Sequence, residues 1–136
     1  CYEGEFKKDF PHGYGIQYYQ NKSAYASGKF KYGELNGLAI LNNFTNGITF
    51  AIGKVRCFTP CQKAHFIYPN GDNYFGKCKG FSKHGKGTLY CANGDIITGK
   101  FKNDKLNGKA YLNTLKSDFY ICFYENGKQI SKIKIE

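Results

Sequence analysis

Residues 70–90 read NGDNYFGKCKGFSKHGKGTLY. In residues 74–79 the side chains alternate with a period of two, which is typical of a β-strand because successive strand residues point to opposite faces. Residues 88–90 follow a polar, glycine-rich connection and form a candidate returning strand. The Asn70-Gly71 pair matches a type I′ turn, whose two central residues both need a positive φ angle. The stretch therefore predicts two short antiparallel strands bounded by tight turns.

The same pattern recurs through the chain at steps of 23 to 25 residues. Its glycine slot is filled by Gly4, Gly28, Gly53, Gly76 and Gly99, and Cys122 takes the next slot. The residues two positions before and after this slot are mostly aromatic or otherwise apolar, and they share a strand face with the glycine. From these slots we expect a repeat core made of Tyr2, Gly4, Phe6, Gly28, Phe30, Gly53, Tyr74, Gly76, Gly99, Phe101 and Tyr120.

Five repeats and a terminal cap account for residues 1–136. We place the repeats at about 2–25, 26–50, 51–73, 74–96 and 97–119, and the cap at 120–136. The repeat at 51–73 is degenerate, because Gln62 and Ala64 replace its Gly-x-Gly pair. The cap keeps Tyr120, and we expect no room for a second strand after it. Further type I′ turns are expected at Asn46-Gly47 and Asn93-Gly94.

Stacking is what should make such hairpins stable. A lone hairpin is marginal in water, whereas stacked hairpins bury a continuous row of side chains. The composition agrees, because 12 Tyr, 12 Phe and 17 Gly suit short strands and tight turns better than helices. We predict an all-β fold, an elongated single-layer twisted β ribbon of stacked antiparallel hairpins. No run of about 18 apolar residues is present, so no membrane-spanning helix is expected.

Basic residues recur at two slots on the strand face opposite the repeat core, and we call them the basic ladder. The slot three residues after the glycine holds Lys7, Lys31, Arg56, Lys79 and Lys102. The slot one residue after it holds Lys29, Lys54, Lys77 and Lys100, with Glu5 in the first repeat. Strands stack about 4.8 Å apart, so the ladder predicts a stripe of positive charge. It is open to two interpretations, a contact for an acidic partner or a solvated face that keeps the strands soluble.

No catalytic, metal or cofactor site is predicted. The six cysteines are irregularly spaced, only Cys57 and Cys61 have a spacing seen in zinc sites, and we favour free thiols. No pairing of a nucleophile with a base stands out, so we do not expect an enzyme. Nucleic acid is not an expected partner either, because Arg56 is the only arginine and the rings alternate with the lysines.

These features resemble the MORN repeat family. Its pattern is roughly Tyr-x-Gly-x-Phe/Trp, a polar stretch, and then Gly-x-Gly followed by an apolar residue. Residues 2–6 (YEGEF) and 12–15 (HGYG) match it closely. Residues 74–78 (YFGKC) and 84–87 (HGKG) match it with Cys78 in the aromatic slot. The resemblance covers nearly the whole chain.

The resemblance implies a binding role more than an activity. MORN arrays occur in ciliary radial-spoke proteins, junctional membrane proteins and parasite cytoskeletal scaffolds, and as appendages on lipid kinases and methyltransferases. We therefore expect a non-catalytic protein-binding scaffold or adaptor in the cytoplasm, within a cytoskeletal or ciliary assembly. Two alternatives stay open: a peripheral membrane module that binds anionic phospholipid, and the regulatory repeat domain of a larger enzyme.

We expect the partner to be an acidic protein held in a groove on the concave face. Aromatic side chains would grip a helix or strand of this partner, and the basic ladder would add electrostatic attraction. The expected aromatic residues are Tyr14, Tyr18, Phe66, Tyr68, Tyr90 and Tyr111. Self-association is a further expectation, because the terminal strands of a ribbon offer unpaired backbone groups.

Overall fold

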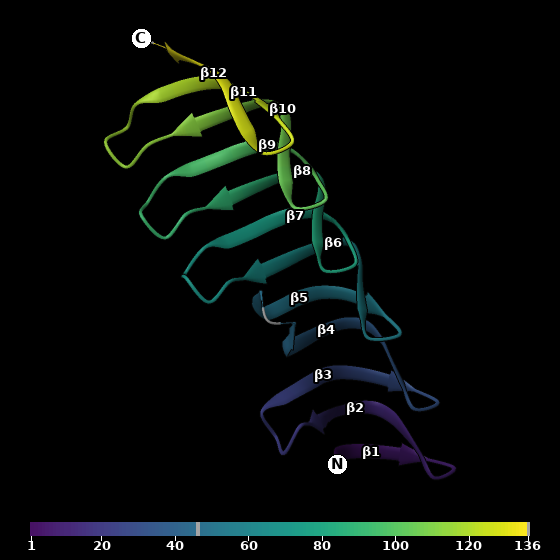
Figure 1. The fold of residues 1–136 in the computed structure, drawn as a ribbon. Coiled ribbons are helices and arrows are strands. Elements are labelled where there is room, and N and C mark those ends of the chain that lie inside the picture. The colour runs from purple at the N-terminus through teal and green to yellow at the C-terminus, as the bar shows by residue number, and fades with distance from the viewer. Residues whose placement is uncertain (46, 136) are drawn as a thin grey trace.

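The computed structural model describes residues 1–45 and 47–135, which form one antiparallel sheet. The strands are β1 (Tyr2–Lys7), β2 (Phe10–Tyr19), β3 (Ala24–Lys31), β4 (Glu34–Thr45), β5 (Ile48–Arg56), β6 (Thr59–Ile67), β7 (Asn73–Lys79), β8 (Ser82–Tyr90), β9 (Ile96–Lys102), β10 (Lys105–Asn113), β11 (Phe119–Glu125) and β12 (Lys128–Ile135). They lie side by side in sequence order, and Figure 1 shows an elongated, twisted array with the termini at opposite ends. The predicted all-β ribbon of stacked hairpins is confirmed.

Most of the two-residue turns along one edge of the array have the type I′ geometry, and the exception is Gly80-Phe81, where only Gly80 is left-handed. Between β9 and β10, Asn103 and Asp104 have φ angles of 50° and 70°. Lys8 and Asp9 repeat this between β1 and β2, and so do Cys57 and Phe58 between β5 and β6. Both central residues are left-handed, as the twist of a two-residue hairpin requires. None of the six residues in these three turns is glycine, which is why sequence patterns alone did not reveal the turns.

The longer turns on the other edge are of a different type. Gly71 and Gly94 have φ angles of 96° and 97°, but the preceding asparagines are not left-handed. Each glycine N–H instead donates to the carbonyl oxygen three residues earlier, at 3.0 Å for Gly71 and 2.9 Å for Gly94. The predicted type I′ geometry at Asn70-Gly71 and Asn93-Gly94 is therefore wrong, because these are type I turns followed by a left-handed glycine. The Asn46 half of the third predicted turn lies outside the described residues.

Each hairpin curls because one of its strands has more residues than the other between the same two cross-strand residue pairs. Residues 76–78 of β7 face residues 83–87 of β8, so the longer segment bulges. Gly85 lies in this bulge with a φ angle of 100°. Equivalent bulge positions are held by Gly13, Gly37 and Gly108, with φ angles of 80°, 107° and 90°, and by Gln62, with 72°. The first residue of each Gly-x-Gly pair is therefore the bulge residue, and Gln62 adopts this conformation without being glycine.

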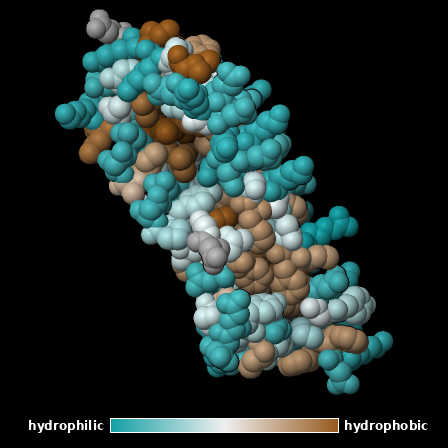
Figure 2. Space-filling view, in the orientation of Figure 1, coloured by the Kyte–Doolittle hydropathy of each residue, from teal (hydrophilic) through white to brown (hydrophobic). Residues whose placement is uncertain are grey.

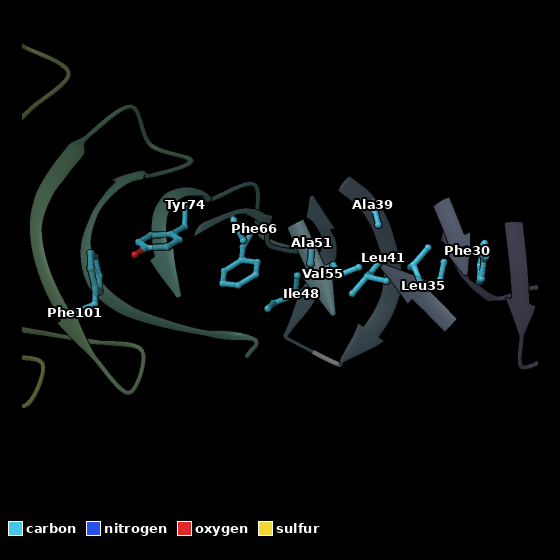
Figure 3. Close-up of a cluster of buried hydrophobic side chains, with 12 residues drawn as sticks. Phe30, Leu35, Ala39, Leu41, Ile48, Ala51, Val55, Phe66, Tyr74 and Phe101 are labelled. Carbon is cyan, nitrogen blue, oxygen red and sulfur yellow. The ribbon is translucent and has the colours of Figure 1, made fainter. Parts of the chain in front are cut away.

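The core is a row of side chains on the concave side of the curled strands (Figure 3). Tyr74 is fully buried, with ring centroids 5.9 Å from Phe66 and 5.2 Å from Phe101. The row continues through Ala64, Val55, Ala51, Ile48, Leu41, Ala39, Leu35, Phe30 and Ala26. Each hairpin therefore covers the apolar side chains of the next, which is the stacking that an isolated hairpin lacks.

The predicted repeat core is only partly buried. Phe30, Tyr74 and Phe101 are buried. Phe6 is 61% exposed, so its assignment to the core is wrong, because β1 has a neighbouring strand on one side only. Tyr2 and Tyr120 are half-buried for related reasons, since Tyr2 lies on β1 and the neighbour of β11 is the exposed strand β12.

The C-terminal segment forms a complete hairpin. β12 pairs with β11 over its length, so the expectation that no second strand follows Tyr120 is wrong. The two strands are joined by Asn126 and Gly127, whose φ angles of 50° and 83° fit a type I′ turn. The Asn126-Gly127 pair is a recognisable turn signal, although no Gly-x-Gly pair follows it to mark a further repeat.

Candidate binding face

A continuous row of lysines crosses the face opposite the core, which we call the outer face. We define the lysine row as Lys54, Lys63, Lys77, Lys86, Lys100 and Lys109, one from each strand from β5 to β10. Lys63 lies directly opposite Lys77 and Lys86 directly opposite Lys100 in the strand register. All six are exposed. Neighbouring members are separated by one strand spacing, about 4.8 Å.

This arrangement costs stability. Like charges placed directly opposite on neighbouring strands repel each other. No carboxylate within the described ranges 1–45 and 47–135 lies within 4.0 Å of a lysine-row ammonium group, since the two ion pairs found there join Lys83 to Asp104 and Lys134 to Asp118. Asp72 and Asp95 lie in the longer turns at the other edge of the array, where Asp72 accepts from the Ala92 N–H at 2.8 Å and Asp95 from the Leu115 N–H at 3.3 Å. Folding alone therefore does not explain why the row is basic.

The basic ladder separates into two parts in the structure. Lys29, Lys54, Lys77 and Lys100 lie on the outer face, beside the slot glycines. The other slot lies at the hairpin tips, because these residues form the last strand pair before each two-residue turn: Lys7 with Phe10, Lys31 with Glu34, Arg56 with Thr59, Lys79 with Ser82, and Lys102 with Lys105. The two slots therefore form two separate lines of charge.

The sequence interpretation missed half of the lysine row. Lys63, Lys86 and Lys109 come from the returning strand of each hairpin and complete the row. A signal for them exists, because each is the middle residue of a Gly-x-Gly slot or its degenerate form. The equivalent residues in the first two repeats are Tyr14 and Leu38, so the row does not extend to the N-terminal end.

Beside the lysine row runs a second line of side chains, which we call the central row. It consists of Ile52, His65, Phe75, Thr88, Thr98 and Tyr111, each opposite the next in the strand register. His65 stacks on Phe75 with ring centroids 3.9 Å apart, and its Nε2 lies 2.8 Å from Oδ1 of Asn73. Phe75 and Tyr111 are 47% and 49% exposed, while the two threonines between them are short. The row therefore has a gap between two exposed rings.

Two shallow hollows lie along the lysine row at equivalent places in different repeats. One, of about 480 Å³, is lined by Lys86, Lys100, Lys109, Thr98 and Tyr111, among other residues. The other, of about 650 Å³, is lined by Leu38, Lys54, Lys63, Lys77 and Gln62, among others. Both lie next to strand bulges, where the curl of the hairpin opens the outer surface. The outer face is thus indented where its positive charge is densest.

The predicted aromatic groove does not exist as one surface. Phe66 is fully buried in the core and Tyr68 packs beside it, so these two rings fill the concave side at this point rather than lining an open groove. Tyr14, Tyr90 and Tyr111 are exposed on the outer face, and Tyr18 is half-buried there, opposite Tyr25. The predicted groove is wrong because Phe66 and Tyr68 lie on the core side, whereas the other four residues lie on the outer face. In the view of Figure 2, a hydrophobic band runs along the array between hydrophilic edges.

The charged side chain of Lys83 enters the concave side, and sequence reasoning did not find it. Lys83 Nζ lies 3.1 Å from the Tyr68 hydroxyl, 4.5 Å from the Tyr68 ring centroid and 3.8 Å from Oδ1 of Asp104. Burial lowers the pKa of Lys83, against the opposing effect of Asp104. Burial also raises the pKa of Tyr68. The signal for Lys83 is its place in the repeat, since the equivalent residues are Pro11, Leu35, Pro60 and Leu106.

Other chemistry finds little support in the described part of the chain. Over residues 1–45 and 47–135, no three His, Cys, Asp or Glu side chains gather into a potential metal site. All six cysteines are free thiols, and burial raises the pKa of Cys78 to about 11. The same residues contain no helix long and apolar enough to cross a membrane.

Comparison with known proteins agrees with the repeat architecture. A family model described as the MORN repeat matches residues 2–24 and residues 83–96. The first match spans the hairpin of β1 and β2, and the second covers most of β8 and the turn that follows it. A search of curated proteins gives no significant match.

Proposed function

Because the chain contains MORN repeats, which generally occur in binding and scaffold modules, we propose that it is a non-catalytic scaffold that docks an acidic protein surface. The observation that carries this proposal is the lysine row, six exposed lysines on six consecutive strands. Their mutual repulsion is relieved when carboxylates of a partner lie between them. The electrostatic repulsion that destabilises the free chain is thus replaced by attraction in the complex.

The overall charge supports the same conclusion. The chain has 20 basic and 10 acidic residues, and its acidic residues are absent from the outer face of β5 to β10. A surface of one sign speeds diffusional encounter with a surface of the opposite sign, and salt screens this effect. As parts of the same proposal, we place the module in the cytoplasm and within a cytoskeletal or ciliary assembly, the setting that its repeat type implies.

The test uses polyglutamate as the acidic probe and two variants with the same net charge. The row variant carries Lys63→Glu, Lys86→Glu and Lys109→Glu. The tip variant carries Arg56→Glu, Lys79→Glu and Lys102→Glu. We expect the row variant to lose binding by about tenfold or more and the tip variant to retain most of it, with the wild-type affinity falling as salt increases. Equal losses in both variants would mean that only net charge matters, which contradicts the proposal.

A peripheral membrane role is the second candidate, and one observation favours it. Tyr90 and Tyr111 are exposed on the same face as the lysine row, and aromatic rings beside basic residues suit the boundary of an anionic bilayer. Vesicles containing phosphatidylserine separate the two candidates. Binding to vesicles without binding to polyglutamate would favour the membrane role, whereas the reverse result supports the docking of an acidic protein.

A further inference from the structure

On the outer face of β7 to β10, four exposed lysines of the lysine row run alongside the central row. We propose that this face binds an acidic, amphipathic α-helix of the partner, laid along the long axis of the array. This inference rests on the proposed function and specifies the partner's conformation. It follows from three features of this face: the spacing of its lysines, the gap in its central row and the twist of its sheet.

The spacing of the lysines matches a helix better than an extended peptide. Lys77, Lys86, Lys100 and Lys109 follow one another at one strand spacing, about 4.8 Å. An α-helix rises 5.4 Å per turn, which is close to the strand spacing of about 4.8 Å. Acidic residues three or four positions apart on a helix can therefore each face one of the successive lysines. Residues on one face of an extended chain are about 6.8 Å apart and lose register sooner. The described edges of this region are also already paired, so a strand cannot add to the sheet here.

The central row supplies an apolar contact beside the charges. Phe75 and Tyr111 are separated by three strand spacings, about 14 Å, with Thr88 and Thr98 between them. The two threonine hydroxyls lie 3.3 Å apart and form the floor of the gap. A large apolar side chain of the partner fits between the two rings, with the lysine row on one side. A buried apolar anchor surrounded by polar contacts is the usual source of interface affinity.

The twist of the sheet sets the length of the contact. Neighbouring strands rotate by roughly 20–25°, so a straight helix remains above one row for only three or four strands. Four strands correspond to about 14 Å, or about ten helical residues at 1.5 Å each. The expected ligand therefore carries acidic residues at i, i+3 or i+4, i+7 and i+10 or i+11. Its apolar stripe lies about 100° around the helix from these, one residue further along.

The experiment compares two labelled synthetic helices of about 18 residues, or five turns, with identical composition. In the first, the glutamates form one stripe beside a leucine stripe. In the second, they are distributed evenly around the helix. Fluorescence anisotropy at physiological salt measures the affinity of each helix for the intact chain. We expect the striped helix to bind at least about tenfold more tightly, because only it satisfies both rows at once.

Two variants locate the site. Thr98→Phe fills the gap without changing charge, and its expected effect is a loss of at least about tenfold in affinity for the striped helix. Lys86→Glu with Lys100→Glu should abolish that binding, whereas the matched tip pair Lys79→Glu with Lys102→Glu should change it by less than about threefold. Far-ultraviolet circular dichroism checks that each variant remains folded.

The outcomes distinguish this inference from the proposed function. Equal affinity of the two helices, with both sensitive to Lys86 and Lys100, would overturn the helical inference and leave acidic docking intact. An unchanged affinity in Thr98→Phe would also overturn it, because the gap would then not be the site. Binding of neither helix would overturn it as well, and the polyglutamate test would decide the proposed function separately. Binding of phosphatidylserine vesicles alone would replace both with a membrane surface.

Discussion

The ring of Tyr74 lies over the α-carbon of Gly87 and occupies the space that any side chain at position 87 would need. Tyr2 lies over Gly15 in the same way in the first repeat. The other repeats have a smaller residue in the tyrosine slot and an alanine in the glycine slot: Ala26 with Ala39, Ala51 with Ala64, and Ile97 with Ala110. The Gly-x-Gly pair thus combines a bulge residue with a residue that makes room for a ring.

This relationship predicts that Gly87→Ala destabilises the chain by about 1–3 kcal/mol, the usual cost of overpacking. Tyr74 cannot move aside easily, because its hydroxyl donates to the Lys77 carbonyl oxygen at 2.5 Å and its ring is fully buried. Urea unfolding measures the change. In a Tyr74→Ala background the added methyl group should cost nothing or stabilise. An equal cost in both backgrounds would show that the ring is not the reason for the glycine.

At position 62, in contrast, we expect the introduction of a glycine to stabilise the chain. The φ angle of 72° at Gln62 is left-handed, a conformation that costs a residue with a side chain about 1 kcal/mol. Gln62→Gly should therefore raise the free energy of unfolding by up to about 1 kcal/mol. Gly108→Gln is the matched control, because a Cβ there meets nothing within 4 Å and only the backbone cost remains. It should lower stability by a similar amount, and a destabilising Gln62→Gly would contradict the argument.

The raised pKa of Tyr74 leads us to expect a loss of stability at alkaline pH. Burial raises its pKa from 10.0 to about 12, so the folded state holds this proton more tightly than the unfolded chain does. Its contribution is fully present below pH 10 and is lost as the pH rises towards 12. Tyr74→Phe should therefore lose less stability than the wild type across this range. Unfolding curves at several alkaline pH values test this, and parallel losses in both proteins would refute it.

We expect that the charge of Lys83 is not needed for folding. Its slot holds leucine at Leu35 and Leu106, and its only ion-pair partner in the described residues, Asp104, is half exposed. Replacement of a desolvated charge by a well-packed apolar residue is often neutral or stabilising. Lys83→Leu should leave the unfolding free energy unchanged or raise it by about 1 kcal/mol. A loss larger than this would mean that the contacts of Lys83 with Tyr68 and Asp104 stabilise the fold. Thermal and urea unfolding together give the answer.

The fold could be read from the sequence because its signals are local. The period of two and the recurring glycines specify hairpins, and a hairpin array leaves only one way to bury the rings. Turn types were harder, because residues such as Cys57 and Phe58 adopt left-handed turns without the usual Asn-Gly signal. Their conformation is imposed by the strands that they join rather than by local preference.

The candidate site was only half predictable for a related reason. Lys54, Lys77 and Lys100 follow the slot glycines and were found by counting along one strand. Lys63, Lys86 and Lys109 join them only through the strand register, which includes a bulge of two extra residues in each hairpin. Without knowledge of that bulge the two strands cannot be aligned, so the full row could not be assembled from the sequence. The face of each residue is unaffected, because two extra residues preserve the alternation along the strand.

The most direct test of the central claim is to see which residues respond to an acidic ligand. We would titrate the isotope-labelled chain with oligoglutamate and record amide chemical-shift changes residue by residue. The account predicts changes concentrated at Lys63, Lys77, Lys86, Lys100 and Lys109 and in the neighbouring central row. Changes concentrated at the hairpin tips, around Lys79 and Lys102, or spread evenly over all lysines would contradict it.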